Sequence, residues 1–252
     1  MMHDTRLLMG MPITVEIVDR APERLMEDVF DHFAAVDARF SMFKPDSEIS
    51  ALNDGRMAVC DVSPQMREVL ALAERTKRET DGYFEIRRAD GLLDPCGIVK
   101  GWAIRNAAHL LRDAGIGNFF VDAGGDIQTS GKNPDGEEWT VGIRNPFNER
   151  EIIKAVTPKG RGIATSGTYV RGQHIYNPRQ PGRPIGDIVS LTVIGPDVLE
   201  ADRFSTAAFA MGKSGIDFIE DLPGFEGYVV DGAGIATQTS GFKAFVPPRA
   251  AA

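Results

Sequence analysis

Apolar side chains recur with helical spacing near the start of the chain. A β-rich run at residues 12–18 comes first. It is followed by apolar positions three or four residues apart, namely Leu25, Val29, Phe33, Val36 and Phe40. This spacing places them on one face of a helix, so a helix buried on that side is predicted.

Two further helices are predicted from their start signals. Ser63-Pro64 combines a favoured N-cap with a residue suited to the first turn, ahead of apolar residues at 66, 69, 70 and 73. Another helix is expected to begin just after the segment DPCG at 94–97. It should run to about residue 114, because Gly115 is typical of a helix end.

Short β-rich runs dominate the chain beyond this point. They lie at 119–122, 139–143, 152–156, 188–194 and 227–230, separated by clusters of Gly, Pro and Asn. A helix at 199–211 and a short helical segment near Ser214 interrupt them. The pattern predicts a single α/β or α+β domain, with residues 248–252 as a frayed tail.

Composition and charge exclude several functions. The 28 basic and 36 acidic residues give a net charge of −8, and no Lys/Arg-rich run could follow a phosphate backbone, so nucleic acid is not an expected partner. Cys60 and Cys96 occur in no CxxC or Cys/His spacing, so we expect free thiols and neither a zinc site nor a disulfide framework.

The sequence also carries no membrane or export signal. No apolar run approaches the length needed to span a membrane, and the opening MMHDTRLLMG lacks the regions of a signal peptide. We therefore expect a cytoplasmic location, although a trimmed form of an exported protein would have the same sequence.

A carboxylate and a hydroxyl stand four residues apart near the C-terminus. On a helix, the oxygens of Asp202 and Thr206 project from one face about one turn apart. Such a pair suits a hard cation such as Mg²⁺. The same residues also fit a structural role, in which Asp202 caps the helix and Thr206 bonds back to its own turn.

Other polar residues allow two interpretations each. Gly124-Gly125-Asp126 follows an apolar strand, where a ligand could approach the backbone, but an ordinary turn explains it as well. Lys100 could meet a phosphate or lie solvated on the surface. His174, in a predicted strand beside Tyr176, could contact a phosphate or act as a base, or be a structural histidine; Tyr169 and Arg171 are equally open.

Taken together and in order, several segments resemble the FAD:protein FMN transferase family, also called the ApbE family. They are MGM at 9–11, FSMFKPDSEISALN at 40–53, DGYF at 81–84, GIVKGWA at 97–103, GGD at 124–126, WTVGI at 139–143, ATSG at 164–167, His174-Ile175 with Pro178, and Ala201-Asp202 with Thr206. Each is weak alone, but their ordered conjunction covers nearly the whole chain.

The resemblance implies a fold and a set of site residues. The fold is a single α+β domain over residues 1–247, whose mixed sheets and packed helices enclose a flavin nucleotide site. Asp202 and Thr206 would bind Mg²⁺ together with the main-chain carbonyl of Ala164. The family positions at the flavin nucleotide are Asn53, Lys100, Gly124, Gly125, Asp126, Ser166, Tyr169 and His174.

The implied activity is cleavage of the FAD pyrophosphate, with transfer of FMN to a threonine hydroxyl of an acceptor protein. With water as acceptor, the same site would release FMN and AMP. Lys100, His174 and Asp202 are the candidate catalytic residues: Lys100 helps the metal neutralise phosphate charge, and His174 contacts the reacting phosphate or assists proton transfer.

The chain departs from the family pattern in the middle. Only residues 85–96 separate Phe84 from Gly97, where family members have a longer segment, so we expect the adenosine half of FAD to be more exposed unless a second subunit covers it. Glu85 replaces the usual aspartate, and Arg105 replaces the usual carboxylate. A flavin-binding protein with little catalysis is therefore the alternative, ahead of a scaffold without ligand. A monomer and a homodimer both remain open.

Overall fold

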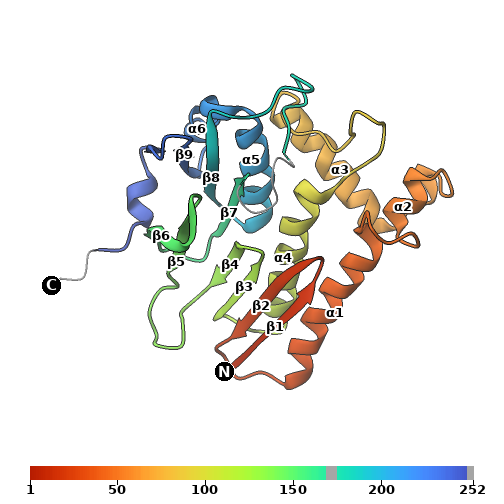
Figure 1. Cartoon of the computed structure of the whole chain (residues 1–252). Coiled ribbons are helices and arrows are strands. Elements are labelled where there is room, and N and C mark those ends of the chain that lie inside the picture. Colours follow the sequence, from red (N-terminus) through yellow and green to blue (C-terminus); the bar gives the residue numbers. More distant parts are fainter. Residues whose placement is uncertain (169–174, 249–252) are drawn as a thin grey trace.

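The computed structural model of the chain describes residues 1–168 and 175–248 (Figure 1). Its helices are α1 Glu23–Phe40, α2 Glu48–Asn53, α3 Pro64–Glu79, α4 Cys96–Asp113, α5 Val198–Ala210 and α6 Gly215–Glu220, with short 3₁₀ turns at Val59–Asp61, Gly212–Ser214 and Phe242–Phe245. Its strands are β1 Met2–Leu8, β2 Met11–Ile17, β3 Phe119–Ala123, β4 Asp126–Ser130, β5 Val141–Asn145, β6 Asn148–Val156, β7 Gly162–Gly167, β8 Ile188–Gly195, β9 Glu226–Asp231 and β10 Ala236–Gln238.

The strands form one large sheet and one small one. The large sheet is eight-stranded, in the order β1-β2-β3-β4-β7-β8-β9-β10, and β5 pairs with β6 in a two-stranded sheet. Every pair of named strands is antiparallel. The fold is thus α+β, as expected, but its described sheets are antiparallel and not mixed. Tight turns join β1 to β2, β3 to β4 and β5 to β6, which is possible only between antiparallel strands.

A layer of helices covers the sheet. Helix α4 packs between α1 and α5 and touches β3 and β4, while α5 lies against β7 and β8 (Figure 1). Apolar side chains from α1, α3, α4 and the strands β2 and β3 fill the largest core cluster. Helices α4 and α5 therefore meet over the middle of the sheet, next to β4 and β7.

The predicted helices are confirmed, although α4 begins at Cys96, inside the DPCG segment expected to precede it. Ser63 caps α3 by accepting a hydrogen bond from the Met66 N–H (3.2 Å), with proline in the first turn. Helix α4 ends at Asp113, and Gly115 follows with a φ of +81°. The β-rich runs at 119–122, 188–194 and 227–230 are strands as well, whereas Trp139 precedes its strand, which begins at residue 141.

Several elements lack a clear signal in the sequence. Strands β1, β4 and β7 and helix α2 were not among the predicted elements, because each is short or mixes polar and small residues. The strand expected around His174 lies partly outside the described residues, and its described part at 175–177 is not a strand. The tail expected at 248–252 lies outside the described residues except for Pro248. Over the described ranges, no helix has the length and apolar character needed to cross a membrane.

Candidate functional site

Lys100 lies between two buried carboxylates where α4, α5 and β4 meet. Its Nζ is 2.6 Å from Asp126 Oδ2 and 3.7 Å from Asp202 Oδ1, and its side chain is only 17% exposed. Three elements far apart in the sequence thus contribute one charge each. Lys100 is therefore not a solvated surface lysine, and the structure brings together three of the residues selected from the sequence.

Asp202 does not cap its helix. The N-cap of α5 is Asp197, whose side chain accepts a hydrogen bond from the Glu200 N–H (3.0 Å). Asp202 lies one turn further on and instead accepts a hydrogen bond from the Gly101 N–H of α4 through Oδ2 (2.8 Å). The capping interpretation of Asp202 is therefore wrong, and its carboxylate faces the junction of the two helices.

Close approach of α4 and α5 depends on Gly101. A Cβ at this position would lie 2.8 Å from the Asp202 Cβ and 2.9 Å from the Leu199 Cα. These separations are shorter than ordinary van der Waals contact between carbon atoms. Only glycine lets the main chain of α4 come near enough to bond the Asp202 carboxylate.

Asp126 is fixed by the strand that follows the double-glycine turn. Gly124 and Gly125 adopt φ values of +62° and +96°, and the Gly125 N–H donates to Asp122 Oδ1 (2.7 Å). The turn interpretation of the two glycines is confirmed in this respect. The turn starts β4 so that Asp126 Oδ1 accepts a hydrogen bond from the Thr165 N–H of β7 (3.0 Å) while Oδ2 meets Lys100.

The cluster of Lys100, Asp126 and Asp202 contains two carboxylates and one ammonium group. Burial raises the pKa of Asp202 to about 7; the positive charge of Lys100 opposes this shift, and the carboxylate of Asp126 adds to it. When Asp126 and Asp202 are both ionised, the buried cluster carries one excess negative charge. A proton or an additional cation neutralises this charge.

Hydroxyl groups line the neighbouring contact between β7 and α5. Ser166 Oγ is 2.9 Å from Ser205 Oγ and 3.5 Å from Thr206 Oγ1. Thr206 is half-buried, unlike Asp202, and its Cγ2 lies close to Gly97 at the start of α4. Ala164, two residues before Ser166 on β7, is completely buried. The residues expected to hold a metal therefore lie on two elements that face each other.

These donors fit Mg²⁺. Among residues 1–168 and 175–248, no three His, Cys, Asp or Glu side chains gather into a metal-binding group. The set here is one carboxylate, one hydroxyl one helical turn away, and a main-chain carbonyl. Mg²⁺ uses few protein ligands of this kind and keeps its remaining positions for water and substrate phosphate oxygens. The unbalanced buried carboxylate beside Lys100 favours a cation in the same place.

Asn53 bonds to main-chain groups on a neighbouring segment. Its Nδ2 donates to the Leu93 carbonyl (3.0 Å), and its Oδ1 accepts from the Leu93 N–H (2.8 Å). Leu93 belongs to a tight hairpin in which it bridges Arg87. Asn53 thus holds the short connection that leads into α4. Tyr169 and His174 lie outside the described residues.

The two residues expected to depart from the family pattern, Glu85 and Arg105, both form ion pairs. Glu85 meets the Lys77 Nζ at 2.5 Å, and Arg105 meets Glu68 of α3 at 3.0 Å. Glu68 also accepts a hydrogen bond from Trp102 Nε1 (2.9 Å). Glu85 therefore connects its turn to α3, and Arg105 connects α4 to α3.

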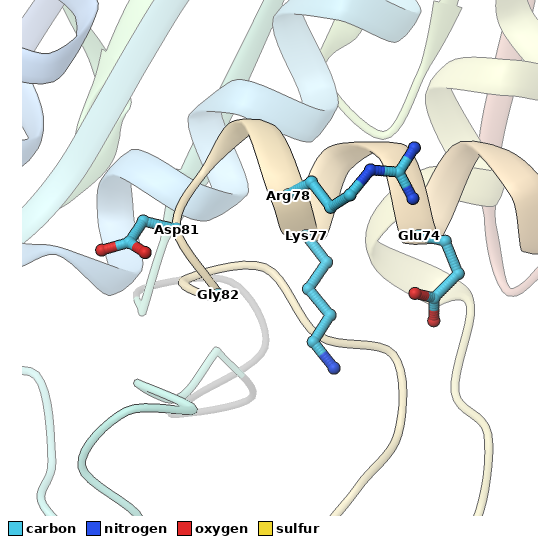
Figure 2. Close-up of a pocket in the computed structure, with 5 residues that line it drawn as sticks. All are labelled: Glu74, Lys77, Arg78, Asp81 and Gly82. Atoms are coloured by element: carbon cyan, nitrogen blue, oxygen red, sulfur yellow. The ribbon is translucent and has the colours of Figure 1, made fainter.

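A separate hollow of about 430 Å³ lies at the C-terminal end of α3. Figure 2 shows the residues that line it, Glu74, Lys77, Arg78, Asp81 and Gly82. None of them belongs to the cluster around Lys100. The hollow is therefore not the candidate site.

Sequence reasoning missed other polar residues of this region. Gln128 of β4 and Ser205 of α5 are buried and hydrogen-bonded there, without any local pattern that marks them. Asp197, the true N-cap of α5, does have a signal, since Glu200 follows three residues later as in a capping box. This pattern predicts the cap at Asp197 and places Asp202 inside the helix.

The chain has the fold of solved flavin transferases. It superposes on the flavin transferase ApbE of Vibrio cholerae with a TM-score of 0.85 and 24% identity, covering 97% of this chain and 99% of that one. The ApbE protein of Thermotoga maritima gives a TM-score of 0.85 at 23% identity, covering 98% and 99% of the two chains.

The chain belongs to the ApbE family, whose sequence profile matches residues 9–91 and 85–229. The FAD:protein FMN transferase of Salmonella typhimurium is 31% identical over 170 residues, which cover 64% of this chain and 47% of that relative. The chain thus matches about half the length of this relative. The family resemblance found in the sequence is confirmed.

Proposed function

We propose that this chain is a Mg²⁺-dependent FAD:protein FMN transferase. In this reaction the bond between the FMN phosphorus and the AMP oxygen breaks, and a bond from that phosphorus to a threonine oxygen of an acceptor protein forms. The threonine loses its proton and AMP leaves. With water as acceptor, the products are FMN and AMP.

The placement of Lys100 against two buried carboxylates, in a member of this family, carries the proposal. Phosphoryl transfer requires mainly positioning and positive charge, because charge on the phosphate oxygens must be neutralised as the bond breaks. The cluster combines a buried ammonium with excess carboxylate charge, and the latter favours a metal ion beside the lysine. Burying such an unbalanced charge costs free energy unless a counter-charge is supplied.

Each side chain has a separate task in the proposed mechanism. Asp202 and Thr206, with the carbonyl of Ala164, hold the metal, which when bound supplies positive charge to the pyrophosphate oxygens. Lys100 binds phosphate oxygen directly, and Asp126 keeps the ammonium group in position. Gly101 orients the Asp202 carboxylate through its N–H. His174 is the proposed contact to the reacting phosphate.

A flavin-binding protein with little catalysis is the second candidate. The observation that favours it is the compact hairpin at residues 86–94, where the family resemblance implies a longer segment. Such a hairpin leaves less material to enclose the adenosine half of FAD. The two candidates share the cluster around Lys100 and differ in turnover.

Incubation with FAD and Mg²⁺ separates the two candidates. The products FMN and AMP and any protein-bound flavin are resolved chromatographically, with and without excess EDTA. AMP formation that EDTA abolishes supports the enzyme. FAD bound without AMP release supports the binding protein, and undiminished cleavage in EDTA with negligible residual metal contradicts the metal-dependent mechanism.

A further inference from the structure

Gln128 connects the sheet to the start of helix α5. Its Oε1 accepts a hydrogen bond from the Val198 N–H (3.0 Å), and Val198 is the first residue of α5. Its Nε2 donates to the carbonyls of Gly160 and Thr129, both at 3.0 Å. The side chain is 1% exposed. A buried amide with these three bonds can adopt only one orientation, because a flip would set its NH₂ against the Val198 N–H.

Gln128 and Asp126 act from the same face of β4. Residues two apart along a strand project to the same side, and both side chains are buried beneath the helices. Asp126 binds Lys100 of α4, while Gln128 binds the first turn of α5. One short strand thus holds both helices that carry the candidate site.

The start of α5 packs closely against β7. A Cβ on Gly162 of β7 would lie 2.0 Å from the Val198 nitrogen, so strand and helix touch through their main chains. Asp202 lies four residues after Val198, one helical turn on. Because each residue adds 1.5 Å of rise and about 100° of rotation, a small change at Val198 carries directly to the Asp202 carboxylate.

We propose that Gln128 is a positioning residue that sets the register of helix α5, that is, its rotation and its position along its axis. It thereby places Asp202 and Thr206 for a divalent cation. The cation part rests on the proposed function. The register part stands on the contacts of Gln128 and is measurable without metal. Gln128 itself touches neither of the two proposed ligands.

The test uses Gln128→Met and two controls. Methionine keeps the length and volume of the side chain but removes its hydrogen bonds. Thr129→Val is the local control, since the Thr129 hydroxyl is buried in the same strand without a hydrogen-bond partner in the described structure. Asn118→Leu is the remote control, because Asn118 also bonds neighbouring segments, through Asp19 and the Lys132 N–H.

The first readout is the Gly101 N–H, which donates to Asp202. Its NMR resonance and hydrogen exchange, without metal, report where the Asp202 carboxylate lies. We expect Gln128→Met to move this resonance and speed its exchange, together with the exchange of the Val198 N–H, while both controls leave them unchanged. An unchanged Gly101 signal in a folded Gln128→Met protein overturns the proposal.

The second readout is Mg²⁺ affinity measured by titration calorimetry. Residues that orient metal ligands typically alter affinity by 10- to 100-fold, so Gln128→Met should weaken binding at least about tenfold and Asn118→Leu less than about twofold. An equal loss of Mg²⁺ affinity in Gln128→Met and Asn118→Leu means general destabilisation and overturns the proposal. If the unaltered chain binds no Mg²⁺, the proposed function fails, and the Gly101 signal alone decides the role of Gln128. Should Gln128→Met not fold, Gln128→Glu is measured by the same two readouts.

Discussion

Replacement of Gly101 by alanine tests the contact on which the site depends. The added Cβ would meet the Asp202 Cβ at 2.8 Å, the Leu199 Cα at 2.9 Å and Asp202 Oδ2 at 3.0 Å. Two of these atoms belong to the rigid first part of α5 and cannot turn away as the end of a flexible side chain would. The helices must therefore separate by several tenths of an ångström or more.

The net effect follows from two opposing contributions. Alanine stabilises a helix interior by about 1 kcal/mol relative to glycine. Overpacking of a tight contact destabilises by about 1–3 kcal/mol, and the stretched bond from the Gly101 N–H to Asp202 adds about 1 kcal/mol. The variant should therefore lose roughly 1–3 kcal/mol of the free energy of unfolding. For a chain of this size, that lowers Tm by about 2–12 °C.

Gly97→Ala is the matched control on the same helix. Its Cβ would come no closer than 3.2 Å, to the ring edge of Phe84, which can shift slightly. We expect it to change stability by less than about 1 kcal/mol. Urea denaturation gives the free energies of unfolding of both variants. Titration calorimetry gives the Mg²⁺ affinity of Gly101→Ala, which should fall; Gly97→Ala is a control for stability alone, because its Cβ would lie 3.4 Å from Thr206 Cγ2. A Gly101→Ala protein as stable as the wild type, with unaltered Mg²⁺ binding, would refute the close contact.

Three further predictions concern charge and ligand binding. Asp202→Asn should abolish Mg²⁺-dependent FAD cleavage while the protein stays folded, because it removes a buried charge but keeps the side-chain shape; an active variant in the AMP assay contradicts its role as ligand. His32→Gln should flatten the decline of stability with acid. Burial lowers the pKa of His32 below its ordinary value of 6.5, and the Ala103 carbonyl, 3.0 Å from Nε2, opposes this shift only in part. The folded ring therefore resists the proton that the unfolded ring takes up. That contribution is complete above pH 6.5 and falls by at most about 1.4 kcal/mol per pH unit below it, which urea denaturation of both proteins between pH 7.5 and 5 will show. Finally, FMN and FAD should compete for the site with affinities within about tenfold of each other, and ADP should bind weakly, because the short hairpin leaves the adenosine exposed; much tighter binding of FAD by a monomer would show that the adenine is enclosed.

Local sequence patterns determined the long helices and the candidate residues. Apolar positions three and four apart predicted α1, and Ser63 with Pro64 marked the start of α3, because these signals act within one or two turns of the chain. The ordered motifs also selected Lys100, Asp126 and Asp202. Residue type and spacing suffice to select candidate residues, because they indicate which chemical groups are available.

Only the tertiary structure decided how those residues are used. The sequence left Asp202 as either a cap or a ligand, and the contact with Gly101 of α4 settled that it does not cap α5. Lys100 meets carboxylates from β4 and α5 because the helices pack over a sheet whose strand order no local signal encodes. Gln128 carried no motif at all. Its role arises from bonds to main-chain groups distant in the sequence, and such contacts exist only once strands have paired and helices have packed.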